Sequence, residues 1–185
     1  GIRTNAGVED FGSSARVDDG LWHHVAVVFN NGNIRIYIDG TLDNSTNRGA
    51  TFGTGVTRFG FLGTGSEATT YNGSRGPNDY FDGDMATFSV WERALTPAEI
   101  SQNRFKCKLG SENGLVIDYN FTEGEGNLIN DNTGNNRNSL LQNITFTTAW
   151  LEDGPTIYGC ASECESERDS VIVIINPAIT NSDVI

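Results

Sequence analysis

The sequence predicts an all-β fold with one short helix, and three observations support this prediction. Short runs of β-branched and aromatic residues recur along the 185 residues, 22 glycines against 4 prolines indicate many tight turns, and one segment alone carries a clear helix start signal. Hydrophobic residues make up 37% of the chain. That content suits one sizeable core, and a chain of this length has no room for two large domains.

The first predicted element is a β-hairpin. Two apolar runs, residues 24–29 and 34–38, flank Asn30-Asn31-Gly32-Asn33, whose Asn-Gly pair tolerates the positive φ of a tight hairpin turn. The dipeptide Asp39-Gly40 then predicts a second turn, with Asp39 as a turn former first and a ligand second.

Two adjacent histidines, His23 and His24, open this hairpin. Neighbouring side chains on a strand point to opposite faces, so the pair is not expected to bind one metal ion together. We expect Trp22 to anchor the strand entry while one histidine hydrogen-bonds beneath a loop.

The middle of the chain predicts loops, another strand and the helix. Residues 48–76 are rich in Gly, Thr and Ser and predict loops with a strand between them at the short apolar run 59–62, and residues 80–91 predict another strand. Thr96-Pro97-Ala98-Glu99 is a capping box with proline at the first helical position. The candidate core side chains of this region are Met85, Phe88, Val90, Trp91, Ile100 and Phe105.

After the helix, the pattern predicts a strand at 114–121, a polar loop at 123–137 and one or two strands at 140–150. Composition becomes acidic at Leu151, and an aliphatic run follows at 171–175. A single strand does not form a stable sheet. The run therefore either adds to the preceding domain, predicted as residues 1–150, or is the edge of another module that begins in the segment 151–185.

Two stretches carry a family resemblance. WHHVAVVFNNGNIRIYIDG, followed by FDGDMATFSVWERALTPAEI, resembles the laminin G-like, concanavalin A-like lectin/glucanase family over about residues 15–106. The resemblance implies a jelly-roll β-sandwich. Residues 109–150 resemble an element that often opens such a domain, so either the early strands are missing upstream or the order of strands is permuted. We favour missing upstream strands, because only about twenty residues precede Trp22.

The tail CESERDSVIVIINPAI resembles the final strand of immunoglobulin-like repeats in very large surface adhesins of gliding and marine Bacteroidetes. This second resemblance implies an extracellular, cell-surface location. It also implies that neighbouring modules of the same long chain are partners.

Net charge limits the kinds of binding partner that the sequence predicts, and the cysteine content leaves the disulfide state open. The net charge of −12 repels phosphate backbones and anionic membrane surfaces, so neither nucleic acid binding nor membrane insertion is expected. No apolar run approaches the roughly 20 residues of a membrane span. The three cysteines, Cys107, Cys160 and Cys164, leave open a local disulfide or free thiols.

Two candidate binding sites lie close together in the sequence. Carboxylates in a glycine-containing loop are the hard oxygen ligands that Ca²⁺ prefers, which makes Asp79, Asp82 and Asp84 candidate calcium ligands, with solvated acids as the alternative. Sugars stack on aromatic rings and need fixed polar partners for their hydroxyls. The candidate carbohydrate-binding residues are Tyr71, Asn72, Arg75, Asn78 and Tyr80.

No catalytic constellation is predicted. Retaining glucanases of this architecture carry a Glu-x-Asp-x-Glu strand, which is absent here. The nearest patterns, at Glu163 to Glu167 and at Glu123 to Glu125, lie outside the predicted strands. The sequence therefore favours a non-catalytic carbohydrate-binding or adhesion module of a large secreted surface protein. The alternatives are a spacer or protein-binding module, and a glycoside hydrolase fragment whose acids were lost upstream.

Overall fold

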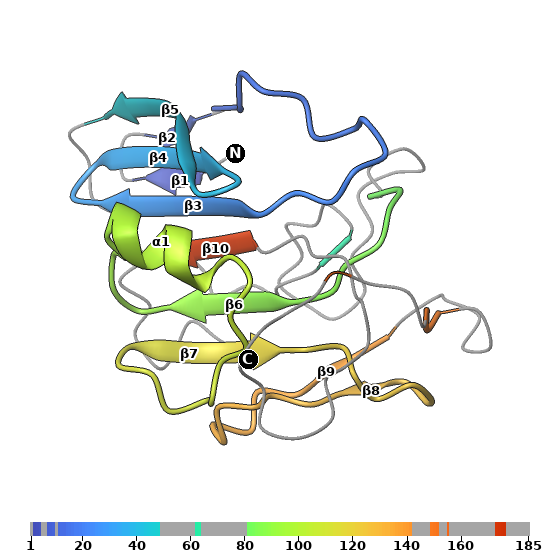
Figure 1. The fold of residues 1–185 in the computed structure, drawn as a ribbon. Coiled ribbons are helices and arrows are strands. Elements are labelled where there is room, and N and C mark those ends of the chain that lie inside the picture. The colour runs from blue at the N-terminus through green and yellow to red at the C-terminus, as the bar shows by residue number, and fades with distance from the viewer. Residues whose placement is uncertain are drawn as a thin grey trace.

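The computed structural model describes residues 2–4, 7–9, 11–48, 62–63, 81–141, 149–151, 155 and 173–176 of the chain. These residues form one large sheet, two small ribbons and one helix (Figure 1). The elements are β1 (Ile2–Thr4), β2 (Gly7–Glu9), β3 (Val25–Asn30), β4 (Asn33–Ile38), β5 (Thr41–Asn47), β6 (Phe88–Trp91), α1 (Pro97–Asn103), β7 (Leu115–Tyr119), β8 (Leu128–Ile129), β9 (Ser139–Leu140) and β10 (Val173–Asn176). The mostly-β class with one short helix is confirmed.

The large sheet has six strands in the order β5-β4-β3-β10-β6-β7. Its outer pairs are antiparallel, and of these β3–β4 and β4–β5 are joined by short hairpin turns, whereas α1 lies in the connection between β6 and β7. The predicted hairpin forms in the expected register, with Val25 opposite Ile38 and Asn30 opposite Asn33. Its turn places Asn31 at φ 47° and Gly32 at φ 82°, the left-handed conformations that the Asn-Gly pair predicts.

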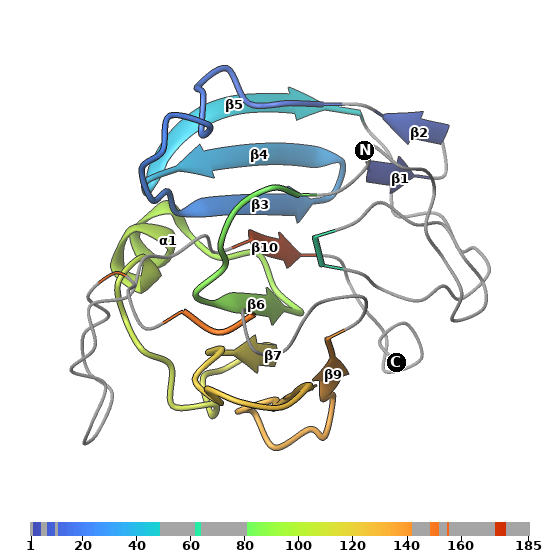
Figure 2. The ribbon, with the colours of Figure 1, turned by 90° about the vertical axis from the view of Figure 1, so that its right-hand side faces the viewer.

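The aliphatic strand near the C-terminus adds to this sheet at its centre. β10 lies between β3 and β6 and is parallel to both, with Ile174 level with Ala26 on one side and Ser89 on the other (Figures 1 and 2). The β3–β4 hairpin and strand β6 therefore belong to the same sheet, and β10 separates β3 from β6. The division of the chain at residue 150 stays a prediction.

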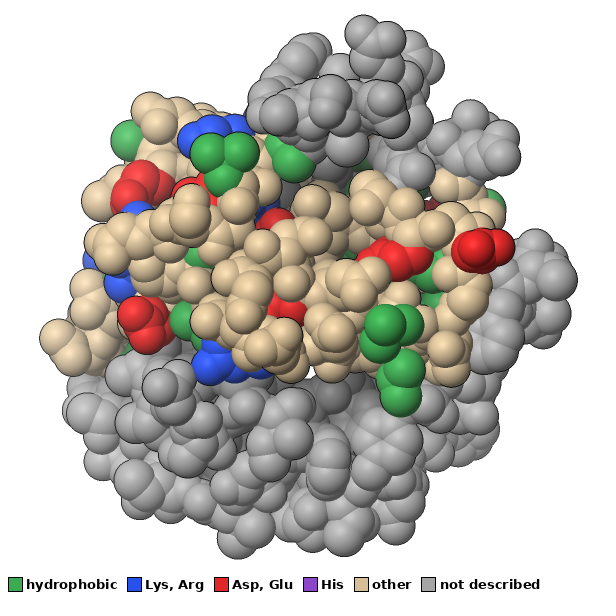
Figure 3. Space-filling view, turned by 90° about the horizontal axis from the view of Figure 1, so that it is seen from below, with side chains coloured by type: hydrophobic (Ala, Val, Ile, Leu, Met, Phe, Trp, Pro, Cys, Tyr) green, Lys and Arg blue, Asp and Glu red, His purple; other side chains and the backbone are tan. Residues whose placement is uncertain are grey.

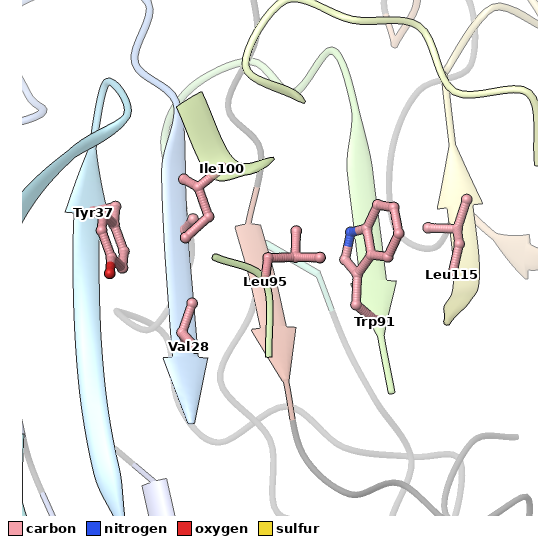
Figure 4. Close-up of a cluster of buried hydrophobic side chains, with 7 residues drawn as sticks. Val28, Tyr37, Trp91, Leu95, Ile100 and Leu115 are labelled. Carbon is pink, nitrogen blue, oxygen red and sulfur yellow. The ribbon is translucent and has the colours of Figure 1, made fainter. Parts of the chain in front are cut away.

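Helix α1 covers one face of the sheet. Thr96 caps the helix as predicted, because its hydroxyl accepts from the Glu99 amide while the Glu99 carboxylate accepts from the Thr96 amide. Ile100 is fully buried, and Figure 4 shows it facing the sheet between side chains of several strands. The cluster contains Ala26, Val28, Tyr37, Trp91, Leu95, Ile100 and Leu115.

A second core cluster joins β6 and β7 to the β8–β9 ribbon, which lies beside β7 (Figures 1 and 2). Its rings include Phe88 and Tyr119, stacked with centroids 5.9 Å apart, and Ile129 of β8 packs against them. The segment predicted as a polar loop thus contains a short strand, because one apolar residue in it reaches the core.

Several predicted boundaries are wrong. The strand predicted from Tyr80 begins only at Phe88, since residues 81–84 are exposed and do not join the ladder. Met85 is partly buried, whereas Phe88, Val90 and Trp91 are core residues as expected. Phe105 was expected to face the body but lies beyond the helix end and is 39% exposed, with the Arg104 guanidinium 4.2 Å from its ring centroid. The predicted strand at 59–62 lies almost entirely outside the described residues, and Leu62 itself is not in a strand.

Two further features bear on the sequence predictions. Cys107 is buried and disulfide-bonded, while Cys160 and Cys164 lie outside the described residues. Within the described part of the chain, no helix is long and apolar enough to cross a bilayer.

Candidate functional site

The structure brings together the two described ends that flank the candidate binding segment, residues 64–80, and this junction of Gly63 and Phe81 is called the loop base below. The two ends meet where the Phe81 amide donates to the Gly63 carbonyl at 2.8 Å. Residues 64–80 connect these two positions in the sequence and lie outside the described residues. The loop base leads through residues 82–85 into the buried Ala86 and Thr87 and then into β6 of the large sheet.

Exposed side chains surround this base. Phe81 is 48% exposed, and its ring lies over Gly83, where an added Cβ would sit 2.9 Å from the ring. Glycine at position 83 is therefore what allows the ring to fold back in this way. Asp82 and Asp84 are exposed on either side of Gly83. An accessible aromatic face beside two carboxylates is chemically suited to a sugar or a hydrated cation.

Most of the predicted site residues cannot be placed. Tyr71, Asn72, Arg75, Asn78, Asp79 and Tyr80 lie outside the described residues. Of the eight predicted residues, the structure shows Asp82 and Asp84, which it brings together at the loop base. In the described ranges, no group of three His, Cys, Asp or Glu side chains is arranged to hold a metal ion.

His23 is held by two carboxylates. Its Nδ1 lies 2.8 Å from Asp39 Oδ2 and its Nε2 lies 3.0 Å from Asp19 Oδ1. The hydrogen bonds to Asp39 and then to Asp19 raise the pKa of His23. Asp39 also accepts from the His24 amide at 3.0 Å, so the carboxylate joins the turn to the start of β3. The predicted structural use of one histidine beneath a loop is thereby confirmed.

His24 has the opposite environment. It is only 3% exposed, and neither ring nitrogen has a hydrogen-bond partner. Burial is the largest cause that lowers the pKa of His24, which falls to about 4. The imidazole is therefore neutral at physiological pH.

A buried polar cluster lies on the same face of the sheet. Asp118, the fourth residue of β7, accepts from the Ser89 hydroxyl at 2.7 Å, and Lys108 Nζ lies 3.8 Å from the same carboxylate oxygen. Lys108 and Asp118 have side chains 2% and 0% exposed. Sequence reasoning missed this pair. The signal for Asp118 was present, because a charged residue inside the run GLVIDYNF is the unusual occupant of a buried strand.

Asp131 organises the loop between β8 and β9. Its carboxylate accepts from the amides of Asp118, Thr133 and Arg137 and from the Thr133 hydroxyl at 2.8 to 3.2 Å. Because these donors occupy both carboxylate oxygens, Asp131 stabilises the turn and is unsuited to bind a metal ion.

Of the two acidic patterns noted in the sequence, the one at Glu123 and Glu125 lies in the described residues, and Glu123 has a structural role there. Glu123 Oε1 accepts from the Asn130 backbone amide at 2.7 Å and from its side-chain amide at 3.2 Å, whereas Glu125 is exposed. In the coloured part of Figure 3, acidic and apolar side chains are scattered over the face seen from below. Nothing on that part of the surface favours it over the loop base as a binding site.

Comparisons with known proteins agree with this fold. The family profile described as "Concanavalin A-like lectin/glucanases superfamily" matches residues 1–101 of the 185. A candidate carbohydrate-binding protein from Bacteroides ovatus has a crystal structure that aligns with a TM-score of 0.53 and 22% identity, covering 70% of this chain and 37% of that one. This likeness shows the fold alone.

Two curated relatives match over shorter stretches. Human neuronal pentraxin-1 is 33% identical over 103 residues, which is 55% of this chain and 23% of that protein. The rat protein named "Sushi, von Willebrand factor type A, EGF and pentraxin domain-containing protein 1" is 28% identical over 121 residues, which is 64% of this chain and 3% of that protein. The matched region therefore spans less than a quarter of either relative.

Proposed function

This chain belongs to the concanavalin A-like lectin/glucanases superfamily, and we propose that it is a non-catalytic module for carbohydrate recognition or adhesion within a large secreted cell-surface protein. The observation that carries the proposal is the loop base, where the hydrogen bond between Phe81 and Gly63 joins the two described ends of the segment. It presents the exposed ring of Phe81 beside Asp82, shortly before strand β6. The Bacteroides ovatus neighbour, named for carbohydrate binding, supports the same class of ligand.

The ligand would be a surface polysaccharide or glycan. Its C–H faces would stack on Phe81 and on Tyr71 or Tyr80, while Asn72, Arg75 and Asn78 would supply hydrogen bonds to hydroxyls. The other partners would be neighbouring modules of the same chain, in keeping with the short share of each relative that is matched.

The absence of catalysis is part of the proposal, since the superfamily also includes glucanases. A retaining glycosidase needs two carboxyl groups about 5 Å apart on either side of a bound sugar. Among the described carboxylates, Asp118 and Asp131 are buried in hydrogen-bonded positions and Glu123 is engaged with Asn130. These three carboxylates are therefore engaged in structural hydrogen bonds, and the two at the loop base, Asp82 and Asp84, are proposed here as calcium ligands.

Carbohydrate binding is tested by glycan-array and polysaccharide pull-down measurements on the intact chain. Replacing Tyr71, Asn72 and Arg75 with alanine should abolish the signal, and Phe81→Ala should weaken it roughly two- to tenfold, because one stacked ring contributes about 0.5–1.5 kcal/mol. Glu125→Gln, an exposed change outside the loop, is the matched control. If the folded wild-type chain binds no glycan, or if the loop variants bind as the wild type does, the module is a spacer or protein-binding unit instead.

Calcium would be held by Asp82 and Asp84 together with Asp79. Both described carboxylates are exposed, so they are free to take hard-oxygen coordination without breaking a core contact. Calcium at millimolar concentration should raise the melting temperature, chelator should reverse the rise, and Asp82→Asn with Asp84→Asn should remove it. An unchanged melting temperature in the wild type would eliminate this site.

A further inference from the structure

The buried pair Lys108 and Asp118 brings an amine and a carboxyl group together away from water. Lys108 follows α1 and Cys107, and Asp118 is the fourth of the five residues of β7. Their side chains are 2% and 0% exposed, and Nζ lies 3.8 Å from Oδ1. This separation is longer than a good charge-assisted hydrogen bond, which spans about 2.7–2.9 Å. The contact is therefore a poor ion pair for groups that have lost their hydration.

Burial changes the protonation of both groups. It lowers the pKa of Lys108 and raises the pKa of Asp118, in each case as the largest effect. Both directions favour the uncharged pair, an amine beside a carboxylic acid. A neutral, desolvated lysine amine is a nucleophile, whereas an ammonium ion is not.

The surroundings of Asp118 suit attack at its carboxyl carbon. Oδ1 is held by the Ser89 hydroxyl at 2.7 Å, and the backbone amide of Asp118 is fixed by Asp131 at 3.1 Å, so the acceptor is well oriented. Oδ2 is buried and has no hydrogen-bond partner. This is the oxygen that is free to depart.

Glu112 supplies a third group in the same place. Its Oε1 accepts from the Leu109 amide at 2.8 Å, which turns the side chain inward, and its Oε2 is buried without a partner. The charge of Glu112 acts on both Lys108 and Asp118. A carboxylate with one unused oxygen near both reactants can accept a proton from the amine and return it to the departing oxygen.

From this arrangement we propose that Lys108 and Asp118 form an intramolecular amide bond, with Glu112 as the proton carrier. Lysine Nζ attacks the Asp118 carboxyl carbon, the new C–N bond forms, and the bond from that carbon to Oδ2 breaks. Oδ2 leaves as water after taking up the amine proton through Glu112. One amine and one carboxylic acid give one amide and one water, so no oxidant, reductant or activating group is required.

The bond would tie the segment after α1 to strand β7 and close a ring that spans residues 109–117. It would also replace two unfavourably buried ionisable groups with one neutral amide. Such a cross-link constrains the unfolded chain as a disulfide does. Covalent closure next to the core would suit a module that transmits tension, although the inference stands independently of any bound glycan.

Mass spectrometry of the full chain tests the proposal directly. After thiol reduction and denaturation, the intact mass should be about 18 Da below the sequence mass, the loss of one water. Trypsin should then fail to cleave after Lys108, so that residues 107–137 are recovered as one peptide carrying that deficit. Cleavage of this peptide after Glu112 should leave its two halves joined, which separates the cross-link from dehydration at an Asp-Gly pair elsewhere.

Substitutions of Lys108, Asp118 and Glu112 test the role of each side chain in the linkage. Lys108→Arg and Asp118→Ala should both restore the full sequence mass. Asp118→Asn keeps the shape of the site and should still link, now with loss of ammonia, about 17 Da. Glu112→Gln should lower the rate of linkage after synthesis roughly a hundredfold or more, while the circular dichroism spectrum remains that of the wild type.

Two results would overturn the inference. One is a folded wild-type chain that keeps its full mass on prolonged incubation and is cleaved after Lys108. The other is a mass deficit that persists in Lys108→Arg or Asp118→Ala. Because these measurements use no ligand, they are decided separately from carbohydrate binding.

Discussion

His24 makes the stability of the protein fall in mild acid, and its environment sets the size of the loss. Burial, the largest cause, lowers its pKa in the folded chain to about 4, against 6.5 for an ordinary histidine. Between pH 4 and pH 6.5, His24 binds a proton in the unfolded chain but stays neutral in the folded chain. The stability contributed by neutral His24 is therefore fully present above pH 6.5 and declines as the pH falls toward 4.

The expected loss is about 3 kcal/mol over that interval, since each pH unit corresponds to roughly 1.4 kcal/mol for one proton. His24→Leu removes the titration and breaks no hydrogen bond, because both ring nitrogens lack partners. At pH 7 this variant should match or exceed the wild type in stability. Its advantage should then grow by about 3 kcal/mol on reaching pH 4.

Urea denaturation at half-unit steps from pH 4 to pH 8, with the slope of the transition held common, measures the difference. His23→Asn is the matched control from the adjacent position. Hydrogen bonds to Asp39 and Asp19 raise the pKa of His23, so its contribution is present below pH 6.5 and is lost as the pH rises through its folded pKa. Parallel stability curves for wild type and His24→Leu between pH 4 and 6.5 would refute the reasoning.

Three other substitutions probe the framework, each measured as a change in the free energy of unfolding. Thr96→Ala should cost about 1 kcal/mol, because it removes the cap that accepts from the Glu99 amide. Ile100→Ala should cost about 2–5 kcal/mol, since it opens a cavity between helix and sheet. Asp131→Ala should cost about 2–4 kcal/mol by leaving its amide donors unpaired, and a cost below 1 kcal/mol would show that water replaces the carboxylate.

Local signals in the sequence predicted the parts of the fold that local physics determines. The Asn31-Gly32 turn and the Thr96 capping box depend on backbone conformation and hydrogen bonds within four residues, and both form as predicted. The start of β6 depends instead on where pairing with β7 begins. The apolar residues from Tyr80 onward therefore predicted a strand that is longer than the observed β6. The central position of β10 depends on partners about 150 and 85 residues away, which spacing cannot reveal.

The candidate site residues likewise fall into those that a local sequence pattern predicts and those that it does not. Asp82 and Asp84 could be selected from the sequence because loop carboxylates beside glycine are a local pattern. Lys108 could not, because its burial arises from the approach of β7 and the charge at Asp118 rather than from its own neighbours in the chain. The aromatic neighbour of the loop acids, Phe81, was assigned to a strand and therefore overlooked as an exposed ring.

The charge of Lys108 links the two predictions about the buried cluster. That charge is the second cause lowering the pKa of His24, after burial. If Lys108 is joined to Asp118 as an amide, the charge is already gone, and Lys108→Met should leave the His24 titration measured by NMR unchanged. If the amine is free and protonated, the same substitution should raise the His24 pKa. The His23 titration should not move in either case, because Asp39 and Asp19 remain its partners. A raised His24 pKa in Lys108→Met would therefore contradict the cross-link by a measurement that does not depend on mass.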